Sequence, residues 1–314
     1  MSNYFDKEKE ICNLANSGKS FVKGFKQELD GFSGKKLFNT LVGLTQNLKG
    51  NNIYLEIGVF RGKTLLTNAV SNPHVRCVGI DNFSLFNESK TNKEIVEKKI
   101  KELNLKNVEL LDMDYEFALD NLNKFLKKDE KVGVFFIDGP HDYRSQLIPL
   151  LKIEKYLANK SIIIIDDANY AHVRQATKDF LTINNSFKLL CEAYTETHVA
   201  NLEEIKKQNV LDGWWNGVNI IVKDEKNYLE KNLPQIDKEN RDFHFLTHDF
   251  MRSRYIEINH ELMSLITRLK NEPLNDRDII EKIKILIKSH ESNFPNRYNH
   301  QNTYSNELTN FKLF

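Results

Sequence analysis

The chain has 314 residues, enough for one large domain with additions or for two domains. Its 45 basic and 44 acidic side chains nearly cancel, which gives a net charge of +1 and argues against nucleic acid or a membrane surface as a partner. Three cysteines without a CxxC pair, no signal peptide and no long apolar run predict a cytoplasmic protein with reduced thiols, without a disulfide framework or a membrane span.

Residues 1–50 are predicted to form an N-terminal helical segment, because Leu37, Leu41, Leu44 and Leu48 recur at helical spacing. From residue 51 the pattern changes to apolar strands that alternate with helices. The expected strands are 53–57, 76–81, 108–112, 132–138, 161–166, 187–194 and 217–223. The expected helices are 63–71, 92–103, 115–127, 143–158 and 171–183. Five strand–helix units followed by two closing strands predict an α/β fold with a doubly wound, seven-stranded, mostly parallel Rossmann-like sheet over residues 51–224.

Residues 225–314 are predicted to form a C-terminal helical extension built around a helical hairpin. Its first arm carries apolar residues over 255–269, and its second arm carries Ile279, Ile283 and Leu286 after a breaker at 271–275. The stripe over 255–269 fits either the core of the hairpin or the seam of a homo-oligomer.

The glycine-containing turn after the first strand is the most informative motif. Residues 53–64 read IYLEIGVFRGKT, an apolar run that ends at Glu56 and is followed by Gly58, Gly62 and Thr64. Glycine lets a backbone approach a ligand closely, and this order of residues is the form that such a turn takes when it cradles S-adenosylmethionine (SAM). We therefore expect Glu56, Gly58, Phe60, Arg61, Gly62 and Thr64 to surround the cofactor.

Each of the five expected parallel strands ends in at least one acidic residue. Ligands of open α/β sheets bind beyond the carboxyl ends of the strands, where these acids would lie. Asp81 and Asn82 end the second strand, about 20 residues past the turn, where an acid accepts hydrogen bonds from ribose hydroxyls. Asp112 and Asp114 end the third strand. They could meet the adenine amino group or could simply cap the helix that follows.

Asp138 ends the fourth strand, and Asp166 and Asp167 end the fifth, so their side chains should converge. Three hard oxygen ligands suit Mg²⁺ or another hard divalent cation. His141 would lie over the same crevice and could take the proton of a hydroxyl, since imidazole titrates near neutrality. The alternatives are a turn at Asp138, helix caps at the aspartate pair and a polar loop histidine.

These segments together resemble class I SAM-dependent methyltransferases over residues 51–224, and among them the metal-dependent branch of macrolide-sugar and natural-product O-methyltransferases. The resemblance rests on Glu56-Ile-Gly58-Val-Phe-Arg-Gly62, Gly79-Ile-Asp81, Phe136-Ile-Asp138-Gly-Pro-His141-Asp-Tyr143 and Ile164-Ile-Asp166-Asp167. It implies SAM contacts at Glu56, Gly58, Gly62 and Asp81, metal ligands at Asp138, Asp166 and Asp167, and His141 as the base. The expected acceptor is a hydroxyl of a saccharide or small natural product.

Three other functions compete with this hypothesis. A metal-independent SAM methyltransferase would use the aspartates as caps. A nicotinamide-dependent oxidoreductase would carry Gly-x-Gly-x-x-Gly, but Glu56 occupies the first position of that fingerprint. A non-catalytic SAM-binding protein would not need the full set of acids. Trp214 and Trp215 fit equally well a substrate mouth or packing on the edge of the sheet.

Overall fold

The computed structural model describes residues 4–23, 29–87, 91–195, 204–236, 262–264, 266–267 and 276–293. The chain divides into two compact units, residues 1–237 and 238–314. In the second unit, helix α11 (Asp276–Asn293) covers the predicted second arm of the hairpin, and most of the predicted first arm lies outside the described residues. The predicted boundaries at 50/51 and 224/225 stay predictions.

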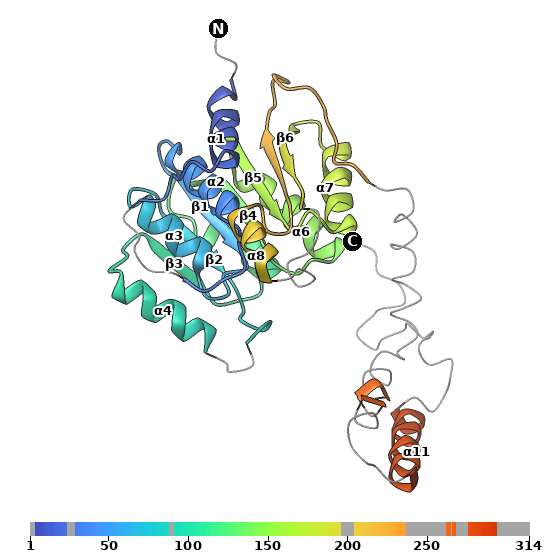
Figure 1. Ribbon diagram of the computed structural model, residues 1–314. Helices are drawn as coiled ribbons and strands as arrows, with labels where there is room; N and C mark the ends of the chain where they lie inside the picture. The colour runs from blue at the N-terminus through green and yellow to red at the C-terminus, as the bar shows by residue number, and fades with distance from the viewer. Residues whose placement is uncertain are drawn as a thin grey trace, which may run out of the picture. The chain divides into compact units, whose positions relative to one another are not determined.

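The first unit is built on a seven-stranded sheet with the strand order β3-β2-β1-β4-β5-β7-β6 (Figure 1). All neighbours from β3 to β5 are parallel, and β7 runs antiparallel to both β5 and β6. The strands are β1 (Asn52–Ile57), β2 (Cys77–Ile80), β3 (Val108–Leu111), β4 (Lys131–Ile137), β5 (Leu157–Asp166), β6 (Phe187–Ala193) and β7 (Val218–Lys223). This topology confirms the predicted doubly wound Rossmann-like sheet.

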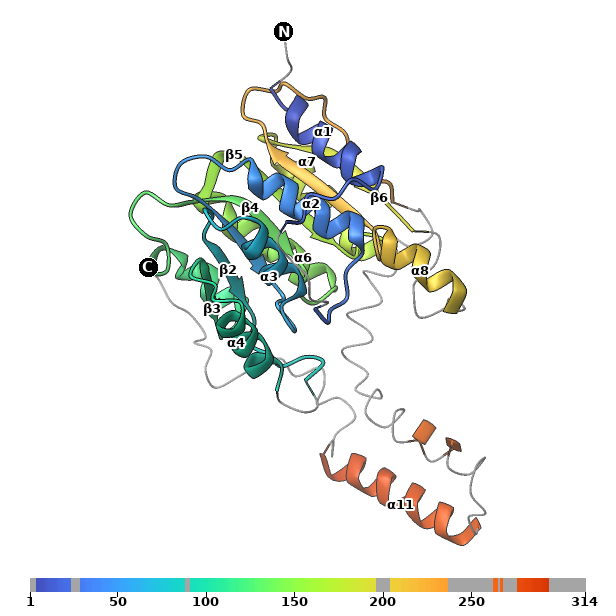
Figure 2. The same ribbon diagram turned by 60° about the vertical axis from the view of Figure 1, so that its left-hand side comes forward.

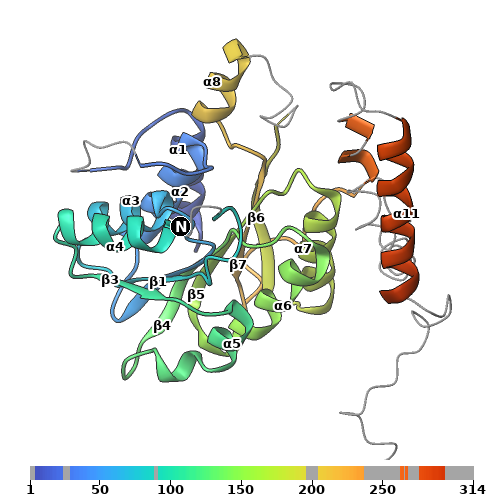
Figure 3. The same ribbon diagram turned by 90° about the horizontal axis from the view of Figure 1, so that it is seen from below.

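Helices cover both faces of the sheet, as Figure 3 shows with the sheet nearly on edge. One face carries α1 (Asp6–Asn16), α2 (Lys35–Gln46), α3 (Lys63–Ser71) and α4 (Asn92–Glu102). The other carries α5 (Tyr115–Asp120), α6 (Tyr143–Ile153) and α7 (Ala171–Ile183). Successive residues of a strand supply opposite cores: Tyr54 and Phe136 pack toward α1–α4, and Leu55 and Phe135 pack toward α5–α7.

The N-terminal helices are part of this core and not an appendage. Leu37, Leu41 and Leu44 of α2 are fully buried in the cluster that also holds Tyr54 of β1. Figure 2 shows α1 and α2 lying along the sheet beside α3. The periodic leucines therefore cover one face of the sheet. The strands are apolar on both faces, so both faces need such a cover.

Two predicted helices are shorter than expected. The predicted helix 115–127 ends at Asp120 and continues as a 3₁₀ turn over Leu122–Lys124. The predicted helix 143–158 ends at Ile153, and a 3₁₀ turn over Glu154–Tyr156 leads directly into β5, which begins four residues earlier than the predicted start at Ser161. Helical periodicity continued across both boundaries in sequence, but backbone pairing with β4 decides where β5 begins.

Candidate functional site

The turn between β1 and α3 lies directly against the end of β4. Gly58 and Gly62 have φ values of +89° and +86°, a conformation that side chains disfavour. A Cβ atom at Gly58 would lie 1.7 Å from the carbonyl oxygen of Asp138. Glycine at this position therefore allows the turn and the end of β4 to meet, and it brings the predicted cofactor turn to the predicted metal ligand.

Glu56 is fully buried beneath the turn, and both of its carboxylate oxygens are hydrogen bonded. The Tyr54 hydroxyl donates to Oε2 at 2.5 Å, and the Thr64 hydroxyl donates to Oε1 at 3.2 Å. The pKa of Glu56 is raised to about 8, mainly by burial; the two hydroxyl donors oppose this shift, and the nearby Asp81 adds a smaller rise. The Glu56 carboxyl thus stays protonated over much of the neutral range.

Asp81 holds the cofactor turn in place. Its Oδ2 accepts the backbone N–H groups of Val59 at 2.9 Å and Phe60 at 2.8 Å, and its Oδ1 accepts that of Phe83 at 2.7 Å. The carboxylate therefore fixes the turn by accepting N–H groups, and its contact with a ribose stays a prediction. Asn82 accepts from the backbone and the hydroxyl of Ser84 and closes a local turn.

The remaining predicted cofactor residues point to other partners. Arg61 donates through Nε to Asn92 at 3.1 Å, and its guanidinium lies 5.3 Å from the ring centroid of Phe60. Asp112 forms an ion pair with Lys93 at 2.8 Å. Asp114 is the N-cap of α5, where its side chain accepts the N–H groups of residues 116 and 117. The helix-cap alternative describes the observed contacts of Asp114.

Asp138, His141 and Asp167 come together at the carboxyl ends of β4 and β5. Each offers one ligand atom, and these atoms lie within 4.8 Å of one another. His141 Nε2 lies 2.8 Å from Asp167 Oδ2. Burial raises the pKa of Asp138 well above its usual range, and repulsion by Asp166, Asp167 and the nearby Glu56 and Asp81 adds to the shift. Such repulsion falls when a cation binds, so this donor set fits a hard divalent ion.

Asp166 has a buried side chain beside this group. Its Oδ1 accepts the backbone N–H of Asp167 at 2.9 Å, and its Oδ2 has no hydrogen-bond partner among the described residues. Burial, followed by repulsion from Asp167, raises the pKa of Asp166 well above its usual range. An orphaned buried carboxylate oxygen is costly unless a ligand answers it, which again fits a cation at this edge.

Two residues that were not predicted from the sequence orient this group. Asn216 is buried and donates through Nδ2 to Asp167 Oδ1 at 2.6 Å. Tyr170 stacks on His141 with a centroid separation of 5.6 Å. Asn216 could have been found from its position just before the last strand in the sequence. Because β7 runs antiparallel to β5, the start of β7 lies beside the carboxyl end of β5. Asp167 adopts a φ of +57°, and its two oxygens are held by His141 and Asn216.

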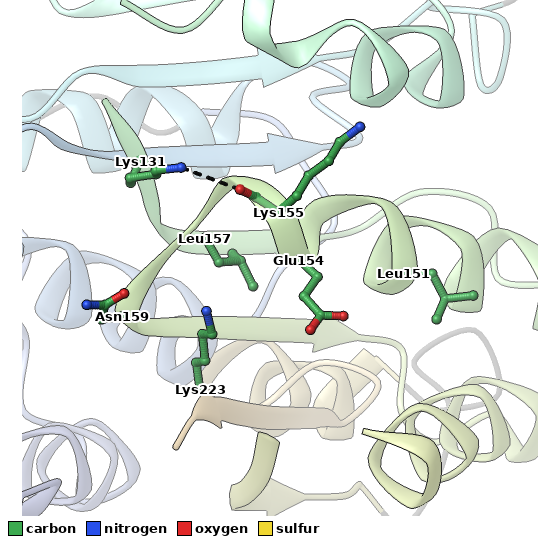
Figure 4. A pocket seen from close by; sticks show the side chains of 7 residues that line it. All are labelled: Lys131, Leu151, Glu154, Lys155, Leu157, Asn159 and Lys223. Atoms are coloured by element: carbon green, nitrogen blue, oxygen red, sulfur yellow. Dashed lines mark hydrogen bonds between the residues drawn. The ribbon is translucent and has the colours of Figure 1, made fainter. Parts of the chain in front are cut away.

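A hollow on the described surface lies away from this group. It has a volume of about 540 Å³ and is lined at the opposite edge of the sheet by Lys131, Leu151, Glu154, Lys155, Leu157, Asn159 and Lys223 (Figure 4). Lys131 begins β4, whereas Asp138 follows its other end. The hollow is therefore not part of the candidate site.

The fold is of the Rossmann-like methyltransferase type. In it, β7 lies antiparallel between β5 and β6, a glycine turn follows β1, and acids stand at the carboxyl ends of the parallel strands. Residues 55–168 match the sequence model of a family described as a methyltransferase domain. Residues 55–168, which run from β1 to just past β5, are thus similar to a methyltransferase domain. No curated protein sequence matches the chain.

Two solved structures are similar to the chain at low identity. An O-methyltransferase from Bacillus cereus in complex with SAH is 17% identical, with a TM-score of 0.45 over 69% of this chain and 91% of that one. The O-methyltransferase TomG from Streptomyces achromogenes, in complex with SAM, is 15% identical, with a TM-score of 0.44 over 70% and 90%.

Proposed function

We propose that this protein transfers a methyl group from SAM to a hydroxyl oxygen of a small molecule, with Mg²⁺ or a similar divalent cation at the site. The observation that carries the proposal is the convergence of Asp138, His141 and Asp167 against the Gly58 turn of a methyltransferase domain. SAM, when bound, supplies an electrophilic methyl group, and a divalent cation supplies positive charge that makes a neighbouring hydroxyl more acidic.

The residues of the chain would divide the work as follows. Gly58 and Gly62 leave room for the donor, and Asp81 lies where it can accept hydrogen bonds from it. Asp138 and Asp167, with Asp166 beside them, would hold the cation. Most of the rate gain would come from placing the two reactants together.

His141 is the proposed base. Because Nε2 lies 2.8 Å from an Asp167 oxygen, it is the nitrogen that carries the proton in the neutral ring. Nδ1 is then the atom that takes the proton of the acceptor hydroxyl. Asp167 would fix the tautomer and the ring orientation, and Tyr170 would support the ring from one face.

A metal-independent methyltransferase is the second candidate. The His141–Asp167 pair is complete without a cation, which favours it. Within the described residues no helix has the length and apolar character needed to cross a membrane. From the sequence we propose the cytoplasm as the compartment and a saccharide or small natural product as the acceptor.

Calorimetric titration with SAH and with NADH tests the donor first. We expect SAH to bind and NADH not to bind, and the opposite result would exclude the proposal. On a verified acceptor, turnover should fall sharply in EDTA and return with Mg²⁺; full activity in EDTA would select the metal-independent candidate.

The role of His141 is tested by His141→Ala with His172→Ala as the matched control. Both imidazoles stack on Tyr170, at 5.6 and 5.4 Å, but only His141 belongs to the carboxylate group. We expect His141→Ala to lose about 100-fold or more in kcat and His172→Ala to keep most of it. Equal rates for the two variants would show that His141 is not the base.

A further inference from the structure

Four aromatic rings form a cluster that the proposed chemistry does not use. Phe32 stacks on Phe60 with centroids 5.1 Å apart and an interplanar angle of 20°. Trp215 lies 6.0 Å and Phe86 lies 6.1 Å from the same Phe32 ring. These four residues, here called the aromatic platform, come from four separate segments of the chain.

The platform is open to solvent where an ordinary core would be closed. Phe32 is 55% exposed and Phe86 is 64% exposed, and the neighbouring Leu85 is 57% exposed. Rings of this size dominate the energetics of cores and interfaces, so several exposed together mark a binding surface more often than a single exposed side chain does.

Backbone conformation gives a second, independent observation. Phe60, Phe86 and Trp215 have φ values of +51°, +49° and +58°, in the left-handed region that bulky side chains avoid. Strain of this kind persists only where the surrounding structure enforces it, and it gathers at ligand sites. Three of the four platform residues carry it.

Contacts behind the rings hold the strained segments rigidly. A Cβ atom on Gly34 would lie 2.7 Å from the Trp215 backbone nitrogen, so the segment that carries Phe32 packs directly on the turn that carries Trp215. Lys63 at the start of α3 donates to the carbonyl oxygens of Gly31 at 3.3 Å and Ser33 at 3.1 Å. The backbone on both sides of Phe32 is therefore held in place.

A buried asparagine fixes the other half of the platform. Asn92 donates through Nδ2 to the carbonyl oxygen of Phe86 at 2.9 Å and accepts from Arg61 Nε at 3.1 Å. Arg61 is the residue next to Phe60. One side chain thus ties together the segments of two platform rings. Because these segments are already held in place, ligand binding would cost little conformational entropy.

Two platform residues lie close along the chain to residues that contact the carboxylate group. Trp215 directly precedes Asn216, whose amide donates to Asp167 at 2.6 Å. Phe60 follows two residues after Gly58, whose backbone lies against the carbonyl of Asp138. The chain thus places Trp215 one residue, and Phe60 two residues, from a contact with one of the two acids.

We propose that the aromatic platform binds a flat apolar ring of the methyl acceptor, so that the acceptor is an aromatic compound with a ring hydroxyl. This inference rests on the proposed function, because the hydroxyl must reach the Asp138, His141 and Asp167 group. The four rings offer stacking faces and, apart from the Trp215 indole N–H, carry no hydrogen-bonding group of their own; the Arg61 guanidinium lies 5.3 Å from the centroid of Phe60. A saccharide presents hydroxyls around its ring and needs polar partners, so an aromatic ring fits the platform better.

Calorimetric titration with 2,3-dihydroxynaphthalene as the probe tests this, in the presence of saturating SAH and Mg²⁺. Phe32→Ala and Phe86→Ala remove platform rings. Tyr228→Ala is the matched control, since Tyr228 is also an exposed ring (46%) stacked on another, Tyr4 at 4.8 Å, away from the acids. Each variant is also titrated with SAH alone, and methyl α-D-glucoside replaces the probe in a parallel titration.

We expect each platform variant to bind the probe about tenfold more weakly than the wild type or Tyr228→Ala, with unchanged SAH affinity. Equal probe binding by wild type and Phe32→Ala, or failure of the wild type to bind it, would overturn the proposal, as would equally tight binding of the glucoside. A matching loss of SAH affinity would assign the rings to the donor, and conversion of a dimer to a monomer in Phe32→Ala would assign them to a subunit interface; both also overturn it. If SAH does not bind the wild type, the proposed function fails, and titration with the probe alone still tests the platform.

Discussion

The buried Glu56 carboxyl should make the stability of the protein depend on pH in a specific direction. Its pKa is about 8 in the folded protein against an ordinary value of 4.5, so the folded state keeps a proton that the unfolded chain releases. Stability from this group is complete below pH 4.5 and is lost as pH rises toward 8. Glu56→Gln replaces the protonated carboxyl with a neutral amide of the same shape and removes the effect.

The size of the effect follows from the pKa gap. At about 1.4 kcal/mol per pH unit, ionising Glu56 between pH 5 and pH 9 lowers the free energy of unfolding by on the order of 4 kcal/mol. The two variants should therefore be similarly stable at pH 5, and Glu56→Gln should be the more stable at pH 9. Glu56→Gln leaves neither hydroxyl without a partner. Tyr54 and Thr64 contact different oxygens of Glu56, so one can donate to the amide oxygen of Gln and the other can accept from its N–H group.

Urea unfolding of the ligand-free protein at pH 5, 7 and 9 measures the difference. Glu94→Gln serves as the control, since Glu94 is an exposed carboxyl on α4. A constant difference between wild type and Glu56→Gln across the three pH values would refute the assignment of Glu56 as a buried, protonated acid.

Two further substitutions test the geometry of the site. Gly58→Ala should abolish SAH binding and destabilise the protein by about 3 kcal/mol or more, whereas Gly18→Ala, with the same φ of +89° and no atom near its Cβ, should cost only about 1 kcal/mol. Asn216→Leu should weaken Mn²⁺ binding, measured by paramagnetic resonance, about 10- to 100-fold, because it removes the donor that orients a carboxylate of the site. Asn219→Leu, a buried amide that donates to Tyr194 instead, should leave Mn²⁺ affinity unchanged. Similar losses for both members of either pair would contradict the geometric explanation.

Local sequence patterns were enough to predict the sheet and most of the acids at the carboxyl ends of its strands. Strands buried on both faces are continuous apolar runs, and an acid after each run marks the carboxyl end, so the meeting of Asp138 with Asp167 could be predicted from order alone. The ends of α5 and α6 could not be predicted, because apolar residues continue at helical spacing past the last residue of each helix.

What sequence order could not supply was the contact between segments far apart in the chain. The Trp214–Trp215 pair illustrates this: Trp214 is buried and donates to Asn16 of α1, whereas Trp215 faces Phe32. Only the packing of the segment at Gly34 on the turn before β7 separates these two roles. Asn216 became visible for the same reason, once β7 was placed antiparallel to β5.

The most direct test of the central claim is a crystal of the protein grown with SAH and Mn²⁺, with anomalous data collected at the manganese edge. We predict one manganese peak bounded by Asp138 and Asp167, with the SAH sulfur on the Gly58 side of the same cavity. SAH bound elsewhere, or manganese bound away from both aspartates, would contradict the account.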